Sequence, residues 1–240
     1  MPKLPEQLTL AIDAAHKPDF DSFVAVEGNP VVAVLRQFVN RNDAAWPLLE
    51  GTAGTGRSHL LLATARAAFE QGRPVQYLAT ADHIDSAVAF FDHLRGGEYA
   101  LVDDLDLLFG SDQAERACFN AFNRLRQGGG ALLAAVAPGW SNRVKLPDLR
   151  SRLNWGQRLI LTPLPDQQIE QLLQQRARDL GIELSATVVR YMMTRHQRNL
   201  SQLIDLLQKS ADRSLKLRRK VTVALVREVM SDLVAQQATA

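Results

Sequence analysis

The eight residues 51–58 constrain the fold of this chain more than any other segment. They read Gly-Thr-Ala-Gly-Thr-Gly-Arg-Ser, which is the phosphate-binding P-loop pattern with arginine in place of the usual lysine. The segment follows a predicted strand, residues 47–50, and precedes a predicted helix, residues 58–71. A glycine-rich turn in this position lets backbone N–H groups close around phosphate oxygens at the positive end of the helix. We therefore expect a nucleotide-binding α/β domain.

The side chains of this loop suit a nucleotide and a magnesium ion. Ser58 can supply a hydroxyl to Mg²⁺. Arg57 keeps the positive charge of the usual lysine but replaces a compact ammonium with a planar fork, so we expect it to bind phosphate while placing the β- and γ-phosphate oxygens less well for hydrolysis. The alternative is a glycine-rich turn without a ligand. The nucleotide contacts predicted in this region are Gly51, Thr52, Gly54, Thr55, Gly56, Arg57, Ser58 and His59.

An apolar strand that ends in two carboxylates supports the nucleotide site. Residues 99–103 are mostly apolar up to Asp103, and Asp104 follows. This is the Walker B form, in which one acid holds the magnesium ion and its water shell and the next polarises an attacking water. The sequence predicts Asp103 as a metal residue and Asp104 as a catalytic residue, with acids that cap a solvated turn as the alternative. The nearby Asp106 is expected at the surface.

Short apolar segments alternate with amphipathic segments up to residue 162. This alternation predicts a five-stranded parallel sheet with right-handed crossovers. Gly72 and Gly128 are expected to end two of its helices. Beyond two prolines at 163 and 165 the pattern is helical throughout, with about four helices. The predicted organisation is a tail at 1–15, a nucleotide-binding α/β domain at 16–163 and a helical lid domain at 164–240. The predicted strands are 47–50, 75–79, 99–103, 131–137 and 159–162.

Composition excludes several other classes of protein. The single cysteine, Cys118, rules out an internal disulfide, and the five histidines have no metal-binding spacing. The longest apolar run, residues 131–137, is far shorter than the roughly 20 residues of a membrane helix, and the N-terminus has no signal-peptide pattern. A net charge of +2 gives no electrostatic argument for nucleic acid. We expect a cytoplasmic protein with little direct DNA binding and no membrane partner.

Further motifs give the chain a family resemblance. Residues 20–23, followed by Asn29, resemble the segment that borders the adenine pocket of the bacterial replication initiator DnaA, an AAA+ protein. Residues 51–60, 103–104 and 146–153 resemble the P-loop, Walker B and box VII of DnaA. The resemblance runs from about residue 20 onward, and we expect neither the longer N-terminal domain nor the DNA-binding domain of DnaA. A short DnaA-like core with a Gln-Leu-x-Leu tail is similar to the Hda family of DnaA-related regulators.

The resemblance implies roles for single residues around the nucleotide. Phe23 and Asn29 match residues beside the bound nucleotide, and Arg198 matches the sensor 2 arginine that reaches the phosphates from the lid. Arg152 matches the arginine finger of box VII, which stabilises a γ-phosphate held by another subunit. An ordinary surface arginine is the alternative reading of Arg152 and of Arg198.

The tail and the overall function are also implied by the resemblance. Gln7, Leu8 and Leu10 match the motif that binds the β sliding clamp of DNA polymerase III. The family fold is an AAA+ module, with a five-stranded parallel sheet sandwich, a small C-terminal helical lid, and ADP or ATP with Mg²⁺ as cofactor. The implied function is regulatory inactivation of DnaA, in which the clamp-bound protein stimulates hydrolysis of DnaA-bound ATP and limits re-initiation. Homo-oligomerisation is left open.

Two other functions stay open at the level of sequence. One is a self-sufficient AAA+ ATPase that remodels or loads a replication protein. The other is a nucleotide-gated adaptor without a catalytic contribution. Weak intrinsic ATPase activity is expected, because Arg57 replaces lysine and because Ala137 stands where the family has a polar sensor 1 residue.

Overall fold

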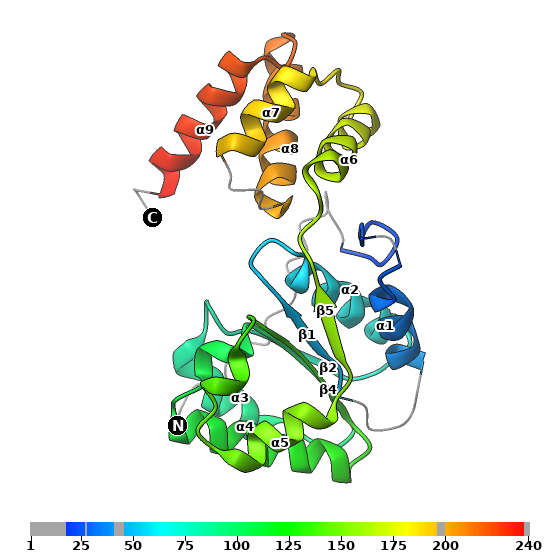
Figure 1. Ribbon diagram of the computed structural model, residues 1–240, viewed down its shortest axis with the longest axis vertical. Coiled ribbons are helices and arrows are strands. Elements are labelled where there is room, and N and C mark those ends of the chain that lie inside the picture. Colours follow the sequence, from blue (N-terminus) through cyan, green and yellow to red (C-terminus); the bar gives the residue numbers. More distant parts are fainter. Residues whose placement is uncertain (1–17, 27, 41–45, 196–199, 238–240) are drawn as a thin grey trace. The chain divides into compact units, whose positions relative to one another are not determined.

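The structure, a computed structural model, describes residues 18–26, 28–40, 46–195 and 200–237. These residues form two compact units, each with its own core. The first holds the described residues up to Glu50 together with Arg57–Ile160, and the second holds Gly51–Gly56 together with the described residues from Leu161 onward. The first unit is built around a sheet and the second contains four helices (Figure 1).

The sheet of the first unit has the strand order β2-β3-β4-β1-β5. Parallel pairing joins β1 to β4, β4 to β3 and β3 to β2. The predicted parallel α/β sheet of five strands is confirmed, and every strand boundary lies within one residue of its predicted position. The strands are β1 (Leu48–Gly51), β2 (Val75–Ala79), β3 (Tyr99–Asp103), β4 (Ala131–Val136) and β5 (Arg158–Leu161).

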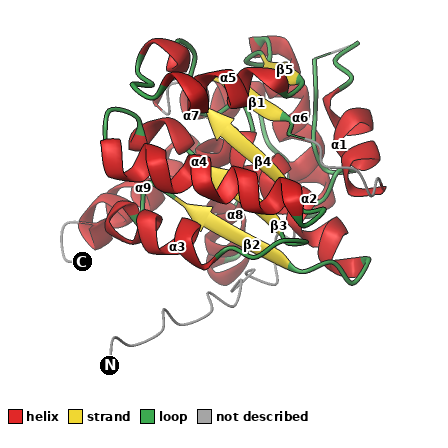
Figure 2. Ribbon diagram, turned by 90° about the horizontal axis from the view of Figure 1, so that it is seen from below, coloured by secondary structure: helices red, strands yellow, loops and turns green. Residues whose placement is uncertain are grey.

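Helices cover both faces of the sheet, as right-handed crossovers require. Among the described elements, α1 and α2 lie on one face and α3, α4 and α5 on the other, with α4 packed between α3 and α5 (Figures 1 and 2). Side chains alternate along β3, so that Ala100 and Val102 pack against the three-helix layer while Leu101 is buried on the opposite face. The two-helix face has α1 (Val31–Asn40) and α2 (Arg57–Glu70); the other has α3 (Ala87–His93), α4 (Asp112–Gln127) and α5 (Pro147–Trp155).

Glycines end the helices of the first unit much as predicted. Gly72 follows α2 with φ +73°, in the left-handed region that favours glycine. Gly128 is the C-cap of α4 but has φ −92°, and Gly129 takes the left-handed conformation with φ +74°. The predicted end of α4 is therefore right, while the glycine that reverses the chain is one residue later.

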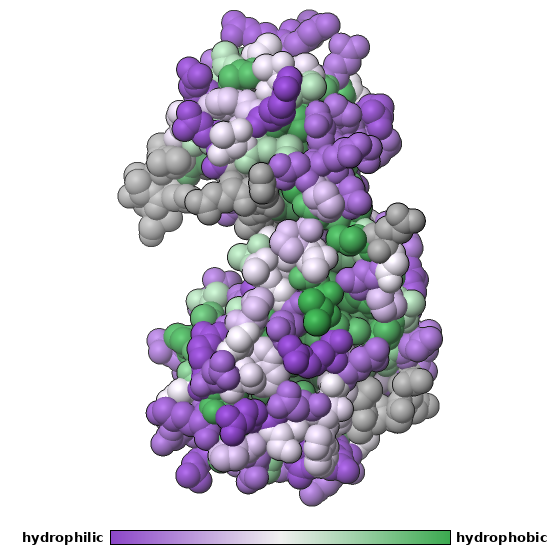
Figure 3. All heavy atoms as spheres, in the orientation of Figure 1, coloured by the Kyte–Doolittle hydropathy of each residue, from purple (hydrophilic) through white to green (hydrophobic). Residues whose placement is uncertain are grey.

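The second unit has, among its described residues, four helices around a core of its own. Gly181, with φ +70°, follows the first of them, and the Thr222 hydroxyl accepts a hydrogen bond from the Leu225 N–H (3.3 Å) at the start of the last. None of the helices in the described part of the chain combines the length and apolar character needed to cross a membrane. On the face drawn in Figure 3, hydrophilic residues predominate and apolar residues form small patches. The helices are α6 (Asp166–Asp179), α7 (Ala186–Arg195), α8 (Leu200–Leu217) and α9 (Val223–Gln237).

A buried glutamate on α4 holds the loop that leads into α5. Glu115 is 1% exposed, and its carboxylate accepts hydrogen bonds from three backbone N–H groups. The donors are Gly110 (2.7 Å), Lys145 (3.1 Å) and Leu146 (2.6 Å). Three donors compensate the cost of burying a carboxylate, which is large for an unpartnered charge. The first turn of α5 is therefore positioned by α4.

Replacing Glu115 with alanine should lower the free energy of unfolding by about 2–4 kcal/mol, because it leaves buried N–H groups unpaired and opens a cavity. Chemical denaturation measures this change. Gln113→Ala, at an exposed position of the same helix, is the matched control and should change stability by less than about 0.5 kcal/mol. A Glu115 variant as stable as its parent would show that the loop does not depend on this carboxylate.

Candidate functional site

The loop between β1 and α2 has the backbone shape that its glycines predict. Gly54 and Gly56 have φ +81° and +91°, where a side chain is strained. Thr55 closes the turn, since its N–H and its hydroxyl both donate to the Thr52 carbonyl, at 3.3 and 2.8 Å. Gly51 has no room for a Cβ, which would lie 2.5 Å from Thr55 Oγ1. This turn ends at the N-terminus of a 14-residue helix, so its backbone fits a phosphate group.

Arg57 is paired with the second acid of the Walker B segment. Its Nη2 donates to Asp104 Oδ1 at 2.7 Å, and the arginine side chain is only 11% exposed. Arg57 Nη1 is buried and has no hydrogen-bond partner among the described residues. A buried N–H group without an acceptor is unfavourable, and a phosphate oxygen is an acceptor of suitable charge. The environment of Arg57 therefore fits a phosphate ligand, while Asp104 serves as its counter-ion.

Asp104 is held in an uncommon backbone conformation. Its φ and ψ are +48° and +42°, in the left-handed region that few residues other than glycine adopt. Burial and the neighbouring Asp103 charge raise the pKa of the Asp104 carboxyl above its usual range, against the opposing effect of Arg57. The surroundings of Asp104, taken together, therefore disfavour its ionised form. Arg57 is the main contact that stabilises the ionised form.

Asp103, the first acid, is buried and oriented by two donors. Its Oδ1 accepts from the Asp104 N–H at 3.0 Å, and its Oδ2 accepts from the Tyr77 hydroxyl at 3.4 Å. Burial, together with the Asp103 charge, raises the pKa of Tyr77 far above its usual value, so the phenol stays a donor. Tyr77 was not predicted as a site residue. Only the pairing of β2 with β3 brings it to Asp103, and no local pattern signals that pairing.

The residues predicted to hold a metal ion do not form a complete site by themselves. Ser58 is exposed at the start of α2, and Asp103 is 5% exposed at the end of β3. Nowhere in the described part of the chain do three His, Cys, Asp or Glu side chains converge as a metal cluster. A magnesium ion here would need oxygen ligands from phosphate and water, as is usual for this ion beside nucleotides.

The expectation that Asp106 lies at the surface is wrong. Asp106 is 4% exposed, accepts a hydrogen bond from the Ala137 N–H at 3.0 Å and pairs with Arg143. A short 3-10 turn, Leu105–Leu108, directs the carboxylate inward after β3. Asp106 therefore joins the segment after β3 to the end of β4, where Ala137 occupies the predicted sensor 1 position.

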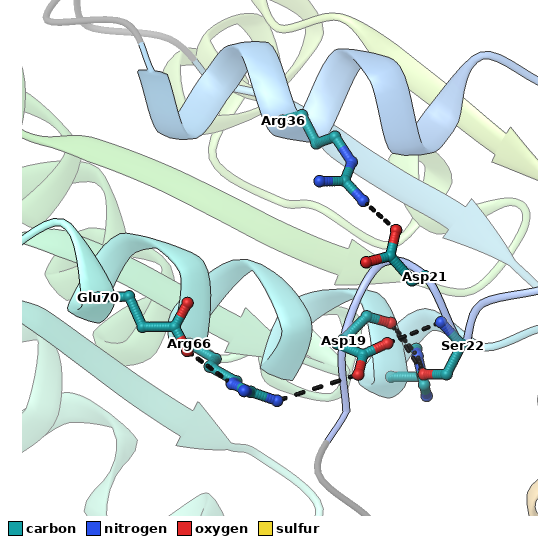
Figure 4. A network of polar contacts seen from close by, with 7 residues as sticks. Asp19, Asp21, Ser22, Arg36, Arg66 and Glu70 are labelled. Carbon is teal, nitrogen blue, oxygen red and sulfur yellow. Dashed lines mark hydrogen bonds and ion pairs between the residues drawn. The ribbon is translucent and has the colours of Figure 1, made fainter.

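A polar network holds the segment before α1 against α2 (Figure 4). His59 Nε2 lies 2.9 Å from the Asp19 carbonyl oxygen and 3.4 Å from Ser22 Oγ, and its ring centre is 5.8 Å from that of Phe23. Although burial raises the pKa of the Asp19 carboxyl, hydrogen bonds from Ser22 and the nearby Arg66 charge hold it below its usual value. Phe23 and His59, two predicted nucleotide contacts, are thus neighbours at the start of α2. The other ion pairs drawn are Arg36–Asp21 and Arg66–Glu70.

Asn29 has both ends of its amide engaged within the first unit. Its Oδ1 accepts from the Val31 N–H at 3.0 Å, and its Nδ2 donates to the Ile160 carbonyl at 3.0 Å. Asn29 thereby joins the start of α1 to β5. Its contact with a nucleotide stays a prediction.

Arg152 lies in the three-helix layer, on the opposite face of the sheet from α2. Its guanidinium carbon is 4.0 Å from the centre of the Trp155 ring, and about 6 Å from Phe119 and Phe122, at 6.0 and 5.9 Å. Among the described residues, no hydrogen bond or ion pair involves this guanidinium. The charge of Arg152 is therefore not neutralised within the described chain. The predictions for Arg198, Gln7, Leu8 and Leu10 concern residues outside the described part of the chain.

The strand order, the P-loop after β1, the two acids at the end of β3 and the additional helical unit together define an AAA+ fold. Residues 166–230 match the family model of the Hda lid domain. The chain therefore has an AAA+ fold similar to that of DnaA, and its residues 166–230 are similar to the lid domain of the Hda family.

Solved structures share this fold. DnaA domain III from Thermotoga maritima is 19% identical with a TM-score of 0.73, and the match covers 90% of this chain and 96% of that one. AMPPCP-bound DnaA from Aquifex aeolicus is 19% identical with a TM-score of 0.63, covering 80% and 64%. RuvB, a Holliday junction branch migration motor from Thermotoga maritima, is 16% identical with a TM-score of 0.65, covering 90% and 72%. At these identities the likeness shows the fold.

The raised pKa of Asp104 predicts how stability depends on pH. The folded protein binds a proton at this carboxyl more tightly than the unfolded chain does, so this group favours folding more as pH falls through the raised pKa. Asp104→Asn, which is uncharged and tolerates the left-handed conformation, should keep or raise the melting temperature at neutral pH. Its advantage over the parent should shrink toward about pH 4.

Thermal unfolding of the Asp104 variant and its parent across this pH range measures the effect. Asp21→Asn is the control, because the Asp21 side chain is 89% exposed and should show little change. A large loss of melting temperature for Asp104→Asn at neutral pH would instead mean that the pair with Arg57 dominates.

Proposed function

We propose that the protein regulates DnaA in the cytoplasm: bound to the β sliding clamp of DNA polymerase III on DNA, it stimulates hydrolysis of DnaA-bound ATP and so limits re-initiation. The observation that carries this proposal is the unneutralised guanidinium of Arg152 on α5, in a chain with an Hda-type lid. The similarity of the fold to DnaA domain III supports DnaA as the partner. The residues after about 163 would act as the lid.

The protein's own nucleotide, ADP or ATP with Mg²⁺, would be held by the loop after β1. Its left-handed glycines and the unpartnered Nη1 of Arg57 support phosphate binding. Ser58 and Asp103 would hold the magnesium ion, which neutralises phosphate charge when bound. The A. aeolicus DnaA of the same fold binds AMPPCP, which supports a nucleotide here. The proposed contacts are Gly51, Thr52, Gly54, Thr55, Gly56, Arg57, Ser58 and His59, with Phe23, Asn29 and Arg198 completing the site.

Two observations favour slow turnover of that nucleotide. Asp104, the acid predicted to polarise a water, is the counter-ion of Arg57 at 2.7 Å and has a raised pKa. Ala137 offers only its backbone N–H, and Asp106 already accepts from it. Both features disfavour a self-sufficient ATPase and favour a nucleotide with a structural role.

Arg152 would act on a γ-phosphate that DnaA holds. A guanidinium fork donates to two phosphoryl oxygens at once and stabilises the charge that develops on them as the phosphoryl group transfers. Arginine fingers supplied across an interface contribute on the order of 10³–10⁵ in rate. The adaptor function requires no such contribution to the rate. A substitution of Arg152 therefore distinguishes the arginine-finger function from the adaptor function.

Arg152→Ala should abolish nearly all stimulation of ATP hydrolysis on DnaA while leaving ADP affinity, clamp binding and stability unchanged. Single-turnover hydrolysis of DnaA-bound ATP, with clamp loaded on DNA, measures the stimulation. Arg150→Ala, an exposed arginine on the same helix, is the control and should stimulate like the parent. Parental stimulation by the Arg152 variant would leave the adaptor function as the explanation.

Replacing Gln7, Leu8 and Leu10 together with alanine should abolish clamp binding, because the motif depends on one amide and two apolar side chains. A clamp pull-down, with and without ADP, measures it, and the thermal transition should not move. Thr9→Ala, at the unspecified position of the same motif, is the matched control. Normal clamp binding by the triple variant would refute the assignment of the tail.

A further inference from the structure

Trp155, the last residue of α5, has a large aromatic side chain that lies outside the hydrophobic core. It is 56% exposed, whereas Leu149 and Leu153 on the same helix are 0% and 3% exposed. Leaving an indole in water forgoes the burial free energy that a core position would supply. The guanidinium nearest to the Trp155 ring is that of Arg152, three residues earlier and on the same side of the helix.

The contact between these two side chains is close. The guanidinium carbon of Arg152 is 4.0 Å from the centre of the indole ring, well inside the range of a cation–π interaction. Phe119 and Phe122 of α4 lie about 2 Å farther from that carbon, at 6.0 and 5.9 Å. Arg152 is half-buried, and of these three aromatic rings that of Trp155 lies nearest to its charged end.

The helix that carries both residues is fixed at its two ends. Directly before the first turn, Glu115 accepts hydrogen bonds from the Lys145 and Leu146 N–H groups. After the last turn, Gly156 passes so near to Trp46 that an added Cβ would lie 1.6 Å from the Trp46 carbonyl oxygen. Because the backbone of α5 is held at both ends, the freedom left to Arg152 is in its side-chain rotamers, and the Trp155 ring restricts these.

A second guanidinium lies near the same ring. The guanidinium carbon of Arg126, from the end of α4, is 5.1 Å from the centre of the Trp155 ring. Neither Arg126 nor Arg152 is paired with a carboxylate among the described residues. Two like charges beside one ring do not neutralise each other, so the ring orders Arg152 and leaves its N–H groups for an anion brought by another molecule.

We propose that Trp155 is the positioning residue of Arg152: the indole holds the guanidinium in an ordered and unneutralised state, ready for a phosphoryl group on a partner subunit. Trp155 acts through Arg152 and does not itself contact the phosphate. The proposal rests on the proposed function of Arg152 as an arginine finger. Ordering a catalytic group before the partner binds raises the rate without strengthening binding of the partner.

The test measures stimulated hydrolysis of DnaA-bound ATP as the concentration of this protein is varied. Trp155→Leu should lower the maximal rate about tenfold while leaving the half-saturating concentration unchanged. Trp155→Phe, which keeps an aromatic face, should recover most of the rate. Phe69→Leu, at an aromatic side chain that is 74% exposed on α2, is the matched control and should behave like the parent.

The outcomes distinguish failure of the proposed function of Arg152 from failure of the positioning role of Trp155. If Arg152→Ala stimulates normally, the proposed function fails, whatever Trp155 does. If Arg152 is essential but Trp155→Leu keeps the parental maximal rate, or changes only the half-saturating concentration, the positioning role is overturned.

A measurement without DnaA tests the contact itself. Trp155 is the most exposed of the three tryptophans, so it dominates quenching of fluorescence by acrylamide. Arg152→Ala should increase that quenching, because it uncovers one side of the indole. Unchanged quenching would overturn the proposal, and unchanged thermal unfolding of Trp155→Phe confirms that the fold is intact.

Discussion

Parallel pairing of neighbouring strands is the constraint on which the candidate site depends. Because β4 lies between β1 and β3 and runs parallel to both, the carboxyl ends of all three meet at one edge of the sheet. The start of α2 therefore lies near the end of β3, and Arg57 reaches Asp104 across 47 residues of sequence. The left-handed Asp104, its raised pKa and its pair with Arg57 all follow from that placement.

Buried carboxylates with specific donors connect this edge to the rest of the first unit. Glu115 ties α4 to the start of α5, and Asp106 ties the segment after β3 to the end of β4. Glu50, directly before the loop, accepts from Trp140 Nε1 at 3.1 Å and pairs with Arg158 of β5. Since a buried carboxylate is tolerated only with its donors in place, each of these contacts specifies one arrangement of the loops around the sheet.

The two arginines of interest differ in what surrounds them. Arg57 is buried beside an acid that neutralises it, which suits holding a nucleotide more than hydrolysing it. Arg152 is half-buried among aromatic rings that order it without neutralising it, which suits action on a phosphate from outside. The proposed function, in which the protein keeps its own nucleotide and acts on that of a partner, needs this division.

The amino-acid sequence by itself determined the strands, the glycine-rich loop and the acids after β3, because these depend on local composition and on backbone conformations that glycine permits. The alternation of strands and helices along the chain also determined the parallel sheet, since a helix that connects two strands of one sheet leaves few other topologies. The tertiary structure decided which side chains meet: Tyr77 with Asp103, Asp106 with Arg143, and Glu115 with the loop before α5. Asp106 was predicted at the surface, because a local pattern gives no sign of a donor 31 residues away at Ala137. Whether a polar side chain is buried depends on partners distant in sequence, and only the folded chain brings those partners within hydrogen-bonding distance.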